Sequence, residues 1–145
     1  MEEKSTQRQT PAIGIAVSLF SLIQGAMAVM APTVFAALGV ATPQSSAIYL
    51  LTLGIVSLTL GWLGLKGRPT AYFFISLLCM LQSFAFRTPD SSFNFIGPIS
   101  FRFSFGREPD LEFTINALAI LFAACSAFAL CKMIEQRAVP AGDPQ

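Results

Sequence analysis

Side chains that could carry out chemistry are scarce in this chain of 145 residues. It contains no histidine, the residue that most often binds metals, ligates haem and acts as a general base. Its serines have no evident histidine or lysine base partner, although nucleophilic catalysis needs one. We therefore expect a protein that is not an enzyme and that binds no metal and no cofactor.

The three cysteines, Cys79, Cys125 and Cys131, lie inside apolar stretches and show no CxxC spacing. They do not form the pattern of a disulfide framework. Buried thiols usually behave as small inert hydrophobic groups, which is the interpretation we favour. Because Cys79 and Cys125 are expected at similar depth, a redox pair or a soft-metal site stays open as the alternative.

Gln24 and Gln82 are the strongest polar residues within the apolar stretches. A glutamine in such a stretch usually hydrogen-bonds to a neighbouring helix, and this is the interpretation we favour. Contact with a bound ligand is the alternative.

The elements that carry these cysteines and glutamines are predicted to be membrane helices. The chain is 54% hydrophobic and 12% charged, with a mean hydropathy of +0.64. No Asp, Glu, Lys or Arg occurs in 12–65, 69–86 or 113–131, and about 20 apolar residues suffice to cross a bilayer as a helix. The sequence therefore predicts an all-α membrane protein, a bundle of four transmembrane helices. The expected spans are 12–31, 46–65, 69–86 and 116–133.

The charged residues predict an orientation for these spans. Six of the nine basic residues fall at one end of the bundle: Lys4, Arg8, Lys66, Arg68, Lys132 and Arg137. By the positive-inside rule that end is cytoplasmic, with both terminal tails, 1–11 and 135–145. A cleaved signal peptide ending at Ala26-Met27-Ala28 is the competing interpretation of the first span. The absence of an Asn-x-Ser/Thr sequon favours a bacterial inner membrane.

Small residues recur at a spacing of three or four along each span, where membrane helices can approach closely. The predicted contact stripes are Gly14, Ser18, Ser21, Gly25 and Ala28; Gly54, Ser57, Gly61 and Gly64; Ser76, Cys79 and Ser83; and Ala117, Ala124, Ala127 and Cys131. We expect these four stripes to meet in one compact core.

The extracytoplasmic loop, 88–115, shows the alternation of a β-hairpin. A five-residue turn at 106–110 would pair Phe105 with Leu111, Phe103 with Phe113, and Phe101 with Ile115. That register would set Arg102 diagonally opposite Glu112. The stretch 93–96 could add a third strand and complete a small antiparallel meander.

Aromatic residues concentrate in and around this loop, where eight of the fourteen phenylalanines fall. An exposed aromatic sheet must close the bundle as a lid, enter the headgroup boundary or dock a partner. The candidate surface consists of Phe93, Phe95, Phe101, Phe103, Phe105 and Phe113.

Three functions are compatible with these features. The leading hypothesis is a non-enzymatic accessory subunit that docks through the aromatic sheet. The alternative is a carrier or sensor of a lipid or hydrophobic small molecule, bound under the sheet near Gln24 and Gln82. An oligomeric channel is the third. The expected partners are membrane lipid and, as alternatives, another membrane protein or a second copy of this chain. The net charge of +1 argues against nucleic acid.

Overall fold

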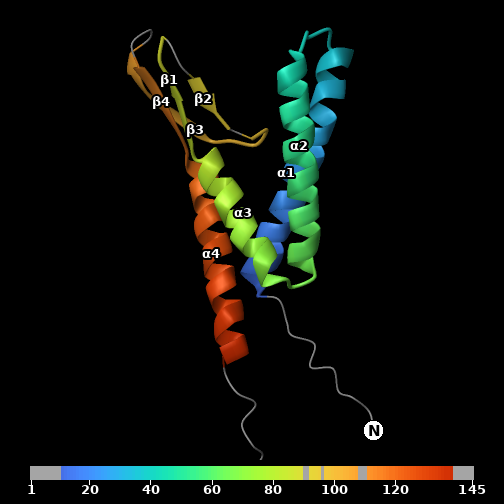
Figure 1. Ribbon diagram of the computed structural model, residues 1–145, viewed down its shortest axis with the longest axis vertical. Helices are drawn as coiled ribbons and strands as arrows, with labels where there is room; N and C mark the ends of the chain where they lie inside the picture. The colour runs from blue at the N-terminus through green and yellow to red at the C-terminus, as the bar shows by residue number, and fades with distance from the viewer. Residues whose placement is uncertain (1–10, 90–91, 96, 108–110, 139–145) are drawn as a thin grey trace, which may run out of the picture.

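The computed structural model describes residues 11–89, 92–95, 97–107 and 111–138. These residues form four helices and a four-stranded antiparallel sheet (Figure 1). The helices are α1 (Ala12–Ala37), α2 (Gln44–Leu65), α3 (Pro69–Gln82) and α4 (Ala117–Ala138). The first, second and fourth are long and apolar enough to cross a membrane, whereas α3 has only 14 residues. The fold is that of a mainly helical protein suited to membrane insertion.

The first two helices end in the same way, at a glycine with a left-handed backbone. Gly39 has φ +72° and Gly67 has φ +68°. After α1, the N–H groups of Gly39 and Val40 donate to the carbonyls of Ala36 and Phe35 over 3.1 and 2.9 Å. This is the Schellman arrangement, which satisfies carbonyls that the helix leaves unpaired.

The first helix is longer than the predicted span 12–31, because α1 continues through Pro32 to Ala37. Proline is tolerated inside membrane helices, where neighbouring groups can satisfy the freed carbonyl. The helix ends instead just before Gly39, the next residue that readily adopts positive φ.

The helices α1 and α2 pack tightly through the predicted small-residue stripes, all of which are buried. A Cβ atom added to Gly54 would lie 2.9 Å from the carbonyl oxygen of Gly25. The Ser21 hydroxyl also donates to the Ser57 carbonyl over 2.9 Å. Close backbone approach of this kind provides the van der Waals contact that holds membrane helices together.

The predicted stripe on the fourth helix is wrong. Ala124, Ala127 and Cys131 are exposed, and α4 instead buries Ala119, Ala123, Ser126, Ala129 and Met133. Both sets repeat every three or four residues, and alanine occurs on several sides of this helix. Residue size therefore could not identify which face packs against α3.

The two helix pairs form two arms that diverge from a common base (Figure 1). Tyr72 of α3, fully buried, ties the arms together there, since its hydroxyl donates to the Gly64 carbonyl over 2.8 Å. We call α1, α2 and their turn the α1–α2 arm, and the end that carries this turn the distal end. The other arm contains α3, α4 and, at its distal end, the sheet.

The third predicted span is wrong at its end, because α3 stops at Gln82 and the chain continues as a strand. The strands are β1 (Phe84–Arg87), β2 (Ser92–Asn94), β3 (Arg102–Arg107) and β4 (Leu111–Asn116), in the order β2-β1-β4-β3. Pairing with β4 makes β1 a strand: the N–H of Asn116 donates to the Ser83 carbonyl over 2.8 Å where the ladder begins.

The predicted hairpin exists, but its register is shifted by two residues. Phe105 pairs with Phe113, and Arg107 pairs with Leu111. Gly106, at φ +114°, lets β3 continue to Arg107. The connection between β3 and β4 is therefore shorter than the predicted five residues. A shift of two leaves every side chain on its predicted face.

The predicted diagonal pair of Arg102 and Glu112 is lost with this shift. Arg102 lies opposite Asn116, and Glu112 lies between Gly106 and Arg87 on the neighbouring strands. The third predicted strand is present as β2, although it pairs with β1 at the far edge of the sheet.

Candidate functional site: the two faces of the sheet

One face of the sheet is almost entirely aromatic. The pairing places Phe93, Phe86, Phe113 and Phe105 in one row across all four strands. The next row contains Phe84, Ile115 and Phe103. The rings also contact one another, with the centroids of Phe86 and Phe93 stacked at 5.7 Å. We call this surface the aromatic face.

The structure brings four of the six candidate phenylalanines onto this face: Phe93, Phe103, Phe105 and Phe113. Phe101 borders it, with its ring edge-on to Phe103 at 5.2 Å. Phe95 lies in the segment after β2, where its ring contacts Phe93 of the aromatic face at 5.0 Å and Tyr49 of α2 at 5.5 Å.

Sequence reasoning missed Phe84 and Phe86, which were assigned to a helix. The order Phe84-Ala85-Phe86-Arg87 alternates between large apolar and other residues, as expected for a strand. Only four residues show that alternation, too few to outweigh the charge-free stretch that precedes Arg87.

The opposite face of the sheet is polar. Asn94, Ala85, Thr114 and Ser104 form one row across it, and the hydroxyls of Ser104 and Thr114 lie 2.9 Å apart. Arg87 and Glu112 are adjacent in a second row, and Arg102 opposes Asn116 in a third. We call this surface the polar face.

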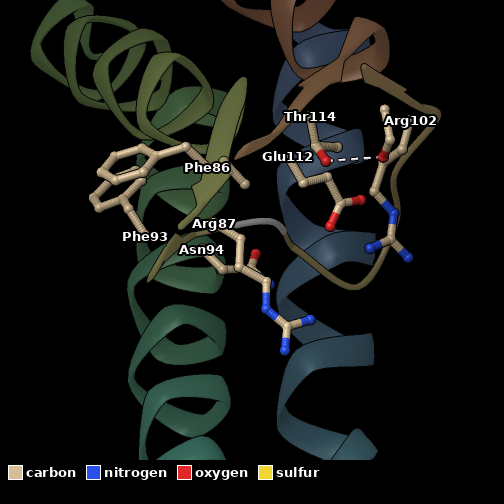
Figure 2. Close-up of a pocket in the computed structure, with 9 residues that line it drawn as sticks. Phe86, Arg87, Phe93, Asn94, Arg102, Glu112 and Thr114 are labelled. Carbon is tan, nitrogen blue, oxygen red and sulfur yellow. Dashed lines mark hydrogen bonds between the residues drawn. The ribbon is translucent and has the colours of Figure 1, made fainter. Parts of the chain in front are cut away.

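A pocket of about 440 Å³ lies on the polar face (Figure 2). Its lining includes two guanidinium groups, from Arg87 and Arg102, and one carboxylate, from Glu112. Figure 2 shows these three charged groups on one side of the sheet, while Phe86 and Phe93 point to the other. With two cations and one anion the lining carries a formal charge of +1, and guanidinium groups bind carboxylate and phosphate oxygens well.

The segment 97–101 connects the polar face to α1. On the sheet side, the N–H of Phe101 donates to Oδ1 of Asn116 over 3.1 Å. On the helix side, Gly97 is buried against the side-chain amides of Gln24 and Gln82. The polar face is therefore the one turned toward this segment and, through it, toward α1.

The structure also brings the two candidate glutamines together. Nε2 of Gln24 donates to Oε1 of Gln82 over 2.6 Å, and both side chains are buried. Nε2 of Gln82 has no hydrogen-bond partner among the described residues. This buried donor is therefore unsatisfied by the described side chains and backbone.

The cysteines lie in the second arm, away from both faces of the sheet. Cys79 is buried in the core between α3 and α4, Cys125 packs partly buried against that core, and Cys131 is exposed. Across the described ranges, no group of three His, Cys, Asp or Glu side chains is placed to hold a metal ion.

Comparison with known proteins adds no assignment, since no protein-family description, no curated protein and no solved structure matches the chain.

Proposed function

We propose that this chain is a non-enzymatic membrane protein that binds an amphipathic molecule with an anionic group, as a carrier or a sensor. The observation that carries the proposal is the pocket on the polar face, where Arg87 and Arg102 arrive from two different strands. Both termini lie on the cytoplasmic side, and the pocket belongs to the extracytoplasmic half.

The chemistry of the pocket favours an anion. Arg102 and Glu112 are not adjacent on the sheet, because the row of Ser104 and Thr114 lies between them. A carboxylate or phosphate can therefore accept from the guanidinium group of Arg102. Because the hydroxyls of Ser104 and Thr114 share one hydrogen bond, one of the two can donate a further bond to the anion.

The surroundings of the pocket favour an amphipathic ligand. The rings of Phe86 and Phe93 point away from the charged groups (Figure 2). The helices beside the sheet, however, expose apolar side chains, such as Val34 of α1 and Ile48 of α2. A volume of about 440 Å³ holds a headgroup or a short chain but not a whole phospholipid. An apolar tail would therefore extend beyond the pocket toward the apolar surfaces of the arms.

Equilibrium binding in nanodiscs tests the proposal, with a fluorescent single-chain carboxylate as the probe and a zwitterionic analogue for comparison. We expect Arg102→Gln to weaken carboxylate binding about ten- to a hundredfold, because a hydrogen bond to a charged group contributes roughly 1.5–3 kcal/mol. Arg102→Lys should recover part of the loss, since it restores the charge without the planar fork.

Arg68→Gln is the matched control, because Arg68 is an exposed arginine at the opposite end of α3. It should leave the affinity unchanged. Equal weakening by Arg68→Gln and Arg102→Gln would mean that the probe responds only to overall charge. That result would contradict anion binding in the pocket.

An accessory subunit that docks through the aromatic face is the second candidate. It is favoured by the exposure of that face, where Phe105 is 57% and Phe103 is 47% accessible. Changes on this face should then release a protein partner and leave the carboxylate probe bound.

A further inference from the structure

The position of the sheet can be measured along α1. The α1–α2 arm has no charged residue between 12 and 65. Its second helix, with 22 residues, is about 33 Å long at 1.5 Å per residue, close to the hydrocarbon thickness of about 30 Å. When this arm crosses a bilayer, Lys66 marks one boundary and the turn between α1 and α2 marks the other.

Gln24 lies near the middle of this length. Beyond it, α1 continues through residues 25–37, which rise about 20 Å toward the distal end. Gly97 is in contact with the Gln24 side chain, so the segment that returns to β3 reaches the middle of α1. The sheet extends distally from that level and stands beside the distal half of the α1–α2 arm, not across its end (Figure 1).

The length of the short third helix also indicates that the sheet begins near the middle of the membrane. Its 14 residues rise about 21 Å, which is less than the hydrocarbon thickness. The four residues of β1 add about 13 Å at 3.3 Å per residue. Helix and strand together cover the charge-free stretch between Arg68 and Arg87.

The apolar surface is also continuous from the helices to the sheet. Met80 of α3, Ile120 of α4 and Phe84 of β1 line one apolar groove of about 330 Å³. On the aromatic face, Phe103 at 47% and Phe105 at 57% are exposed about as much as Leu121 at 57% and Phe128 at 53% on α4. Phe93 and Ile115 on the same face are half-buried.

We infer that the aromatic face contacts the acyl chains of the distal leaflet, so that the sheet is part of the membrane-embedded structure. Phe86, Phe105 and Phe113 then lie among the acyl chains as Leu121 and Phe128 do, and their burial by lipid offsets what their exposure to water would cost. This inference concerns the surface opposite the pocket and does not depend on the proposed ligand.

Such a placement requires water on the other side of the sheet. Backbone with unpaired groups is tolerated at membrane depth only where it is buried in protein or lines a water-filled cavity. Strands β2 and β3 each have one unpaired edge in the order β2-β1-β4-β3. The polar pocket beside these strands, with Arg87, Arg102 and Glu112, supplies that hydrated cavity.

Tryptophan fluorescence in lipid vesicles tests this inference, because Trp62 is the single tryptophan of the chain. In a Trp62→Phe background, Phe105→Trp reports from the aromatic face and Ser104→Trp, its neighbour, from the polar face. Leu121→Trp on α4 is the lipid-facing reference. The quenchers are phospholipids brominated on the acyl chains and iodide in the aqueous phase.

We expect brominated lipid to quench Phe105→Trp as strongly as Leu121→Trp, and several-fold more strongly than Ser104→Trp. Iodide should give the reverse order. If iodide quenches Phe105→Trp and brominated lipid does not, the sheet lies outside the membrane and the inference is wrong. Quenching by neither would show that protein covers the aromatic face, which also overturns it. Should Phe105→Trp fail to fold, Phe103→Trp on the same face replaces it.

Discussion

At the scale of single residues, the junction of Gln24, Gln82 and Gly97 connects the two arms at the level of the middle of α1. Sequence reasoning could select the two glutamines, because amides are rare in charge-free stretches. It could not select Gly97, which lies in a loop and matters only because a Cβ atom there would collide with the Gln24 amide. Contacts of this kind depend on how two distant segments are brought together.

Removal of one glutamine should destabilise the protein more than removal of both. Gln24→Leu leaves the buried amide of Gln82 without its partner, at a cost of about 1–2 kcal/mol. Gln24→Leu/Gln82→Leu removes both polar groups and should recover most of that loss. Gln44→Leu, at the exposed start of α2, is the control for added hydrophobicity. Unfolding free energies in detergent micelles would measure the difference, and additive losses in the double variant would contradict it.

At the scale of elements, two features were predictable from local sequence and two were not. Charge-free length predicted the long helices, and the alternation around Phe103 predicted a hairpin with the correct faces. The strand β1 and the helix face of α4 were missed for one reason. Pairing with β4 determines that residues 84–87 form a strand, and packing against α3 determines which face of α4 is buried. The local sequence is compatible with a helix at 84–87 and with either face of α4.

The hairpin depends on one glycine. Gly106 has φ +114°, and a Cβ atom there would collide with the Leu111 carbonyl. Gly106→Ala should therefore cost about 1–3 kcal/mol locally and release β3 from β4. Hydrogen exchange should then accelerate in these two strands and stay unchanged in α1 and α2.

Gly39→Ala is the matched control for this change. Gly39 also has positive φ, but a Cβ atom there would meet nothing within 4 Å. It should leave exchange in the sheet unaffected. Slow exchange in β3 of the Gly106→Ala protein would mean that the shifted register does not need this glycine.

At the scale of the whole molecule, the two arms diverge, and every residue that lines the candidate site belongs to the sheet at the distal end of the second arm (Figure 1). In the bundle that the sequence predicted, with full-length spans and the sheet confined to the extracytoplasmic loop 88–115, the sheet would not stand beside the helices. The short α3 instead ends near the level of Gln24, and the strands that follow present an aromatic face outward and a polar face toward segment 97–101. The alternation of residues along the strands predicts both faces of the sheet, but it does not predict the level along the helices at which the sheet lies.

Native mass spectrometry of the protein purified from its own membrane into lipid nanodiscs tests the central claim most directly. We predict that the wild-type chain retains a small anionic amphiphile that is missing from Arg87→Gln/Arg102→Gln and present in Arg68→Gln. Retention of the same mass by the double variant would contradict binding at the polar face. A stoichiometric second protein, with no small molecule, would contradict the carrier or sensor function and support the accessory subunit.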